Sequence, residues 1–281
     1  MFLIVKFLNL LGWLMNKLSI FTTMTNPDER NDPWKEALNC YEDLADEVII
    51  VGEDWPYEFR WDHIGKTFQE GFDRCQGEWV IRMDLDYFFH EKDFSYIKKI
   101  LQDNTDSPAI AFPQYQFFTP DRFQVKTKIC IALNKKYFPS IKLNGGGDLC
   151  LPTINNKLIL NNSVPQSKKP VYQYDSIFRT KDIISRDRAR FARAWFSYFN
   201  DWGDRGGATD NEAFDAWYEM IKKRYKHHTN KLIFRKHPSY IYERLDNLEP
   251  NQFGFDAFGL KNKTKRELYS YLKGYKNRFL D

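Results

Sequence analysis

Two aspartates, Asp84 and Asp86, stand one residue apart in the segment IRMDLDYFFHEKD, directly after an apolar run. Alternate side chains of an extended chain point the same way, so both carboxylates could reach one cation. Mg²⁺ and Mn²⁺ prefer carboxylate oxygens together with the phosphate oxygens of a substrate. Such a metal would neutralise a diphosphate leaving group as its bond to a sugar carbon breaks. The alternative is an ordinary polar strand end, with Asp84 hydrogen-bonded and Asp86 solvated.

Attack by a substrate hydroxyl at such a carbon would also need a base that takes the hydroxyl proton. Asp148 is the first candidate, because the glycines of LNGGGDLC permit a sharp turn and the close approach of a substrate. Asp204, in DWGDRGG, is the rival candidate. Either aspartate could instead complete a structural turn.

The segments around the aspartate pair alternate between strand and helix patterns. This rhythm predicts an open α/β sheet, in which ligands bind beyond the carboxyl ends of the strands. Asp84 and Asp86 fall at such an end. Asp32 before Pro33 predicts a helix start, and Gly77 predicts a helix end. We expect strands at 17–25, 46–52, 78–86 and 107–118, and helices at 32–45, 61–77 and 91–103.

The second half of the chain is less regular. Residues 122–143 alternate enough to predict a hairpin, and a glycine turn follows. A helix at 182–199 carries four arginines (Arg186, Arg188, Arg190 and Arg193). They could face a diphosphate or an anionic acceptor, but the pattern favours a solvated face with Phe191 and Trp195 turned inward. Further helices are expected at 210–226 and 261–280.

No linker rich in Pro, Gly or Ser divides the chain. We therefore expect an apolar extension over residues 1–14, a catalytic domain over 15–200 and a helical C-terminal extension over 201–281. The 281 residues suffice for one large core, and 42% hydrophobic with 28% charged residues exclude intrinsic disorder. A net charge of +4 is too small to indicate a nucleic-acid partner.

The four cysteines show no metal-binding spacing, which predicts reduced, mostly buried thiols in a cytoplasmic protein. Residues 1–14 are apolar apart from Lys6, yet shorter than the roughly 20 residues of a spanning helix. Two interpretations stay open. The segment is an interfacial anchor that gives peripheral contact at the inner face of a membrane, or it precedes a domain that starts at Met15.

Several segments together resemble the family 2-type glycosyltransferases with a GT-A fold, nearest to the lipopolysaccharide-core glucosyltransferase branch. They are LSIFTTMTN, WKEALNCYEDLADEVIIVGED and GFDRCQGEWVIRMDLDYFFHEKD, with Trp61 and Ile64 between the last two. The resemblance covers residues 17–103. It implies a GT-A-like, Rossmann-related fold: a mixed, mainly parallel sheet flanked by helices. It also implies that Asp84 and Asp86 bind Mn²⁺ or Mg²⁺ and the diphosphate of a nucleotide sugar.

The resemblance further implies a donor-binding set at the strand ends: Thr23 and Thr25, with Glu53 or Asp54. Lys66, Arg82 and Asp84 complete the predicted set. Asp175 stands where a histidine often closes the family's metal site, and Asp148 where a His-Glu pair supplies the base. The chain departs from the family pattern at Gly52, Gln69 and Tyr87, where Asp, Asn and Glu are usual.

The resulting hypothesis is an inverting, metal-assisted glycosyltransferase that moves a hexose from a nucleotide diphosphate sugar to a carbohydrate or glycoconjugate acceptor. One alternative is a nucleotidyltransferase that forms sugar nucleotides. It would need a glycine-rich loop for a triphosphate after the first strand, and TMTNPDERNDP contains no glycine. The other alternative is a non-catalytic carbohydrate-binding protein on the same scaffold, which the departures at Gly52 and Tyr87 favour.

Overall fold

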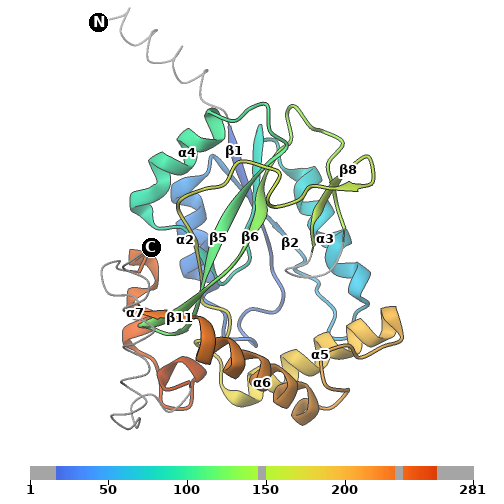
Figure 1. Cartoon of the computed structure of the whole chain (residues 1–281), viewed down its shortest axis with the longest axis vertical. Helices are drawn as coiled ribbons and strands as arrows, with labels where there is room; N and C mark the ends of the chain where they lie inside the picture. Colours follow the sequence, from blue (N-terminus) through green and yellow to red (C-terminus); the bar gives the residue numbers. More distant parts are fainter. Residues whose placement is uncertain (1–16, 145–149, 232–236, 258–281) are drawn as a thin grey trace, which may run out of the picture.

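The computed structural model describes residues 17–144, 150–231 and 237–257, which form a curled main sheet with helices on both faces and a small second sheet (Figure 1). The strands are β1 Leu18–Thr23, β2 Glu47–Val51, β3 Trp79–Arg82, β4 Tyr87–Phe88, β5 Ala109–Thr119, β6 Arg122–Asn134, β7 Lys142–Leu143, β8 Pro152–Ile154, β9 Lys157–Leu158, β10 Val171–Gln173 and β11 Thr229–Lys231. The helices are α2 Trp34–Leu44, α3 Trp61–Arg74, α4 Phe94–Gln102, α5 Lys181–Phe199, α6 Asp210–His228 and α7 Tyr242–Asp246, with 3₁₀ turns η1 Glu91–Asp93, η3 Ser239–Ile241 and η4 Phe253–Phe255.

The main sheet has the strand order β2-β1-β3-β6-β5-β10-β4, with β11 paired to β6. β1 is parallel to β2 and β3, and β5 is parallel to β10. β6 is antiparallel to β3, β5 and β11, and β4 is antiparallel to β10. All these strands except β6 and β4 therefore run in one direction. The mixed, mainly parallel α/β sheet that the sequence predicts is confirmed, and it is consistent with a GT-A-like fold.

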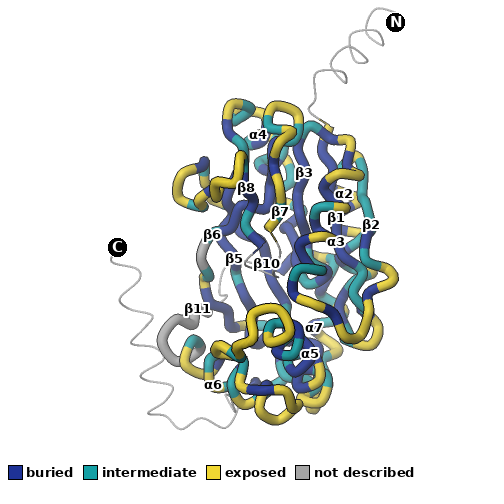
Figure 2. The backbone as a smooth tube through the Cα atoms, turned by 90° about the vertical axis from the view of Figure 1, so that its right-hand side faces the viewer, coloured by how far each residue is buried: buried dark blue, intermediate teal, exposed yellow. Residues whose placement is uncertain are grey.

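The alternation of side chains along β1 shows why both faces of the sheet are covered. Ile20 packs with residues of α2 and α4, whereas its neighbour Phe21 packs with residues of α3. Every residue of β1 is buried, which explains its continuous apolar pattern. The dark strands inside Figure 2 show this burial for the centre of the sheet.

Helices α5 and α6 lie together at the end of the molecule toward which β1 runs (Figure 1). Three alanines at their contact, Ala189, Ala192 and Ala213, are almost fully buried and let the two helices approach closely. Ile184 of α5 and Trp217 of α6 then join Phe118 of β5 in a small cluster. The sheet and this helix pair therefore form the two sides of the cleft described in the next subsection.

Several expected boundaries are wrong, each for a local reason. Residues 122–143 do not form a hairpin of their own, because β6 pairs with β5 and the chain then leaves for the small β7-β8-β9 sheet. Helix α3 ends at Arg74, and Gly77 instead lies against β1. A Cβ at Gly77 would meet Ser19 Oγ at 2.5 Å, so this glycine serves a close approach. The helix expected at 261–280 lies outside the described residues.

All four cysteines are buried and unpaired, as predicted. In the described part of the chain, no helix is both long and apolar enough to cross a membrane. The extension at residues 1–14 lies outside the described residues, as does the glycine turn at 145–149. The domain division proposed from the sequence stays a prediction.

Candidate active site between the sheet and helices α5 and α6

A cleft of about 770 Å³ opens at the carboxyl ends of β1 and β3. This volume is within the usual range for small-molecule sites. On the sheet side it is lined by Thr23, Thr25, Asp84, Asp86, Gln116 and Asp175, and on the helix side by Arg188, Phe191, Trp217, Ile221 and Arg224. The sequence placed its candidate pair at this edge of the sheet, and the structure agrees.

Asp84 and Asp86 reach the cleft from a turn and not from the strand itself. β3 ends at Arg82, and the amide of Tyr87 donates to the carbonyl of Asp84 at 2.8 Å. The amide of Tyr174 donates to the carbonyl of Asp86 at 2.9 Å. The expectation that both aspartates belong to the strand is therefore wrong, but both carboxylates line the same cleft.

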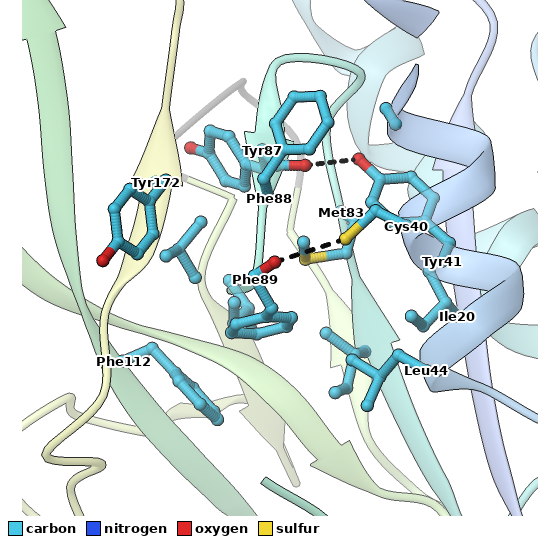
Figure 3. Packing of buried hydrophobic residues seen from close by; sticks show 14 of the residues in the cluster. Ile20, Cys40, Tyr41, Leu44, Met83, Tyr87, Phe88, Phe89, Phe112 and Tyr172 are labelled. Atoms are coloured by element: carbon cyan, nitrogen blue, oxygen red, sulfur yellow. Dashed lines mark hydrogen bonds between the residues drawn. The ribbon is translucent and has the colours of Figure 1, made fainter. Parts of the chain in front are cut away.

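The turn is also fixed from behind by Tyr41 of α2. The Tyr41 hydroxyl donates to the carbonyl oxygen of Asp84 at 2.6 Å. It also donates to the carbonyl oxygen of Tyr87 at 2.9 Å (Figure 3). Burial raises the pKa of Tyr41 well above its usual value, with smaller contributions from Cys40, Asp86 and Asp84. The hydroxyl therefore stays protonated and remains a donor.

Among the described residues, no basic side chain forms an ion pair with the carboxylate of Asp86. Burial raises its pKa well above the usual value for aspartate, and the negative charges of Asp175 and Asp84 raise it further. Arg179 lowers it only as a weaker opposing influence. Among the described residues, no side chain donates a hydrogen bond to this carboxylate, although part of it remains accessible in the cleft. An added cation would relieve this arrangement.

A different pattern surrounds Asp32 and Asp187 on the wall of the same cleft. Arg179 lies between them, with Nη2 2.5 Å from Asp32 Oδ1 and Nη1 3.2 Å from Asp187 Oδ2. Arg30 and Arg190 add ion pairs to Asp187 at 3.5 and 3.0 Å. Burial alone would raise the pKa of Asp187, but Arg30, Arg179 and Arg190 outweigh it and hold that pKa well below its usual range.

This ion-paired group corrects two interpretations of the sequence. Asp32 does not cap α2, because that helix starts after Pro33 without a side-chain cap and the Asp32 carboxylate pairs with Arg179. The arginines of α5 do not share one solvated face. Arg186 is exposed, whereas Arg190 is buried with only 3% of its surface accessible. Phe191 does turn inward, and packs edge-on against Trp61 at 6.0 Å.

Asp175, the predicted third metal ligand, already accepts several hydrogen bonds. Arg188 Nη2 lies 3.2 and 3.1 Å from its two carboxylate oxygens, and Gln116 donates at 3.3 Å. Among the described residues, no three His, Cys, Asp or Glu side chains are grouped so that they could hold a metal by themselves. Mg²⁺ commonly uses one or two carboxylates and takes its other oxygens from water and phosphate. Asp84 and Asp86 fit that requirement, and a role of Asp175 as ligand stays a prediction.

The other predicted residues divide between those that reach the cleft and those that do not. Thr23, Thr25 and Asp204 line it. Arg82 is buried at the end of β3, with its guanidinium over the ring of Phe68 at 4.8 Å. Three residues predicted for the donor site are exposed or ion-paired outside the cleft: Glu53, Asp54 and Lys66. Lys66 pairs with Asp62 at 2.8 Å on the outer face of α3.

Of the two candidate bases, only Asp204 lies within the described residues. Asp204 lies at the cleft, with 80% of its side chain exposed and an ion pair to Arg205 at 3.2 Å. Asp148 lies outside the described residues. Cys150, which is described, has its pKa raised to about 11 by burial, with Arg82 lowering it and Asp84 raising it. Cys150 therefore lies near Arg82 and the Asp84 turn.

Sequence reasoning missed several residues that the fold brings to the cleft. Asp32 and Arg179 are 147 positions apart, so no local pattern joins them. Trp55 lines the cleft with 6% of its surface exposed, and its indole N–H has no hydrogen-bond acceptor among the described residues. Its position three residues beyond Gly52, where the backbone takes φ +72°, is the local signal that could have indicated it.

No protein-family model and no curated protein match the sequence. Among solved structures, the chain is similar to S. aureus TarS residues 1–349, at 11% identity and a TM-score of 0.36, over 75% of this chain and 74% of that one. A TarS complex with UDP matches at 11% identity and a TM-score of 0.36, over 74% of this chain and 72% of that one. A TarS complex with UDP-GlcNAc matches at 10% identity and a TM-score of 0.32, over 75% of this chain and 73% of that one.

Proposed function

We propose that this protein is an inverting glycosyltransferase that moves a hexose from a nucleotide diphosphate sugar to a carbohydrate or glycoconjugate acceptor with the help of Mn²⁺ or Mg²⁺. One observation carries the proposal. The cleft at the carboxyl ends of β1 and β3 contains a partly accessible carboxylate, Asp86, whose surroundings raise its pKa and provide no donor for it. A divalent cation with its bound diphosphate would satisfy that carboxylate.

In this proposal, Asp84 and Asp86 hold the cation, which when bound neutralises the charge that develops on the diphosphate leaving group. Thr23 and Thr25, at the end of β1, contact the nucleoside. Trp55 supplies the contact expected after β2, because it reaches the cleft whereas Glu53 and Asp54 remain exposed. Its unsatisfied indole N–H offers a donor to a bound ligand.

The transfer requires a base for the acceptor hydroxyl. The hydroxyl oxygen attacks the anomeric carbon, the bond from that carbon to the diphosphate oxygen breaks, and the proton passes to a carboxylate. Asp204 lies at the cleft mouth and could accept this proton, and Asp148 remains the other candidate.

Two measurements test the proposal. A screen of nucleotide sugars with Mn²⁺ or Mg²⁺, with released nucleotide diphosphate as the readout, should identify a donor. Thermal unfolding with UDP should show protection that depends on the metal, since ligand binding to the native state raises its stability. If no nucleotide diphosphate protects the protein in the presence of either metal, the proposal fails. Protection without any transfer or donor hydrolysis would instead indicate the non-catalytic carbohydrate-binding alternative.

A further inference from the structure

The last turn of α5 carries exposed aromatic side chains that a packed core does not explain. Phe196, Tyr198 and Phe199 are 36%, 44% and 47% exposed. They make up three of the eight exposed large hydrophobic side chains in the described part of the chain. The helix ends at Asn200 in a left-handed conformation, φ 56°, and the chain turns back through residues 201–206. A concentration of this kind marks an interaction surface.

The rings of this surface are held in place by one another. Phe196 stacks on Trp202 with ring centroids 4.3 Å apart, and Phe199 lies 4.0 Å from Trp195. Tyr198 packs edge-on against Phe199 at 4.7 Å. We call these five residues the aromatic platform. Because the rings are already ordered, a ligand that binds them loses little further side-chain freedom in the protein.

The aromatic platform is continuous with the cleft. The guanidinium of Arg205 lies 3.6 Å from the centroid of Trp195 and 5.3 Å from that of Trp61. Arg205 and Trp61 both line the cleft. Gly203 permits this arrangement, because its φ is +58° and a Cβ there would lie 3.2 Å from Arg205 Nη1. A chain-like ligand could therefore lie on the platform with one end in the cleft.

Charges of both signs surround the platform. Arg60 lies over Tyr198 at 5.3 Å, and Arg205 pairs with Asp204. Asp201 is exposed and accepts a hydrogen bond from the amide of Gly203 at 3.1 Å. Two cations thus stand beside two anions. An anionic membrane surface would favour an excess of basic residues, which this edge lacks. Aromatic faces beside paired charged groups instead suit a neutral ligand with apolar C–H faces and many hydroxyls.

We propose that the aromatic platform binds the acceptor saccharide. Sugar rings stack on Tyr198 and Phe199, and the Asp204–Arg205 pair takes hydrogen bonds with the sugar unit that enters the cleft. The inference rests on the proposed function for the identity of the ligand as an acceptor. It adds the surface that selects the acceptor, and predicts that several sugar units beyond the reacting one contribute to affinity.

The test uses the full chain and four neutral hexasaccharide probes: cellohexaose, maltohexaose, laminarihexaose and N-acetylchitohexaose. Titration calorimetry should show saturable binding of at least one probe at millimolar concentrations. Phe199→Ala and Tyr198→Ala should each weaken it by roughly fivefold to tenfold, the worth of one stacked ring. Phe199→Tyr should retain the affinity. Protection by UDP with Mn²⁺ should stay unchanged in all three variants, because the platform does not line the donor side.

Tyr137→Ala is the matched control. Tyr137 is 55% exposed and follows Asn134, which pairs with Trp79 at the opposite end of β3 from the cleft. This variant should bind the probes as the wild type does. Equal loss of binding in Tyr137→Ala and Phe199→Ala would overturn the inference, as would the absence of binding by any probe.

Two further outcomes separate this inference from its competitors. Sedimentation with vesicles of phosphatidylglycerol and phosphatidylcholine tests a membrane role. Vesicle binding that Phe199→Ala abolishes, without hexasaccharide binding, would overturn the saccharide assignment. If UDP with Mn²⁺ gives no protection while platform-dependent hexasaccharide binding persists, the glycosyltransferase proposal fails and the saccharide-binding surface stands.

Discussion

Two groups of aspartates line the same cleft, and their surroundings shift aspartate pKa values in opposite directions. Asp32 and Asp187 are paired with Arg179, and the pKa of Asp187 is lowered. Asp84 and Asp86 lie on the β3–β4 turn, and the pKa of Asp86 is raised by burial and by neighbouring negative charge. The fold thus supplies an internal cation to the first group, whereas no side chain among the described residues donates a hydrogen bond to the carboxylate of Asp86.

The difference shows which acidic residues are structural. A buried carboxylate that accepts two or three charge-assisted hydrogen bonds has little capacity left for a ligand. The first group joins the loop before α2 to α5, segments more than 140 residues apart in sequence. It thereby fixes the helix side of the cleft relative to the sheet side, whereas Asp86 of the second group lines the cleft and stays partly accessible.

Removal of Arg179, the cation between Asp32 and Asp187, should have the largest effect on stability. Arg179→Met should lower the free energy of unfolding by about 3–5 kcal/mol, because it leaves two buried carboxylates without their shared partner. Urea unfolding at neutral pH measures this. Arg74→Met is the matched control, since Arg74 forms an exposed ion pair with Glu70 at 3.3 Å and should cost less than about 1 kcal/mol. Similar losses in the two variants would mean that the paired group has no special structural role.

The two groups should also respond to pH with opposite signs. The folded-state pKa of Asp187 lies below its unfolded value near 3.9, so its stabilisation is fully present above that value and is lost as the pH falls from there towards the folded-state pKa. The folded-state pKa of Asp86 is raised, so stability is lost as the pH rises from about 4 towards that pKa.

Unfolding in urea from about pH 3 to pH 7 separates the two contributions. The stability difference between wild type and Asp187→Asn should grow as the pH rises, since the neutral amide cannot gain the ion pairs. The advantage of Asp86→Asn over wild type should grow in the same direction. If the stability difference between wild type and each variant did not change with pH, the contrast between the two groups of aspartates would be lost.

Measurements of ligand binding should distinguish the two groups of aspartates more directly than measurements of stability do. Asp86→Asn should stabilise the metal-free protein at neutral pH but weaken Mn²⁺-dependent UDP binding at least tenfold, about 1.4 kcal/mol. Calorimetry with UDP and Mn²⁺ measures the affinity. Asp103→Asn, at an exposed aspartate paired with Lys99 at the end of α4, is the control and should bind normally. Unchanged UDP binding in Asp86→Asn would count against a metal role for this residue.

The sequence predicted the sheet side of the cleft much better than the helix side. Local periodicity locates β1, α2, β2, α3 and β3, and it places the Asp84 pair at a strand end. Arg179 lies only two residues before α5, and nothing in its neighbourhood indicates that it pairs with Asp32. The local signal at Asp32 even favoured a helix cap, because a long-range ion pair overrides a local preference. The exposed rings of α5 likewise could not be distinguished from core residues before their surroundings were known.

The smallest expected effect concerns the rigidity of the turn that carries Asp84 and Asp86. Tyr41 is buried behind the Asp84 turn, and its hydroxyl donates to two carbonyls of that turn. Tyr41→Phe should cost about 1 kcal/mol of stability, because two buried carbonyls lose a donor. It should also weaken Mn²⁺-dependent UDP binding, by less than Asp86→Asn does, since both carboxylates remain but their turn is less constrained.

Tyr240→Phe controls for the loss of a hydroxyl. Tyr240 donates to Asp43 at 2.6 Å on the surface and does not contact the turn, so this variant should bind UDP normally. If Tyr41→Phe loses stability but binds UDP as the wild type does, the backbone bonds from Tyr87 and Tyr174 suffice to hold Asp84 and Asp86. The contrast between the two groups would then lie in their charges alone, and the rigidity of the turn would have no part in it.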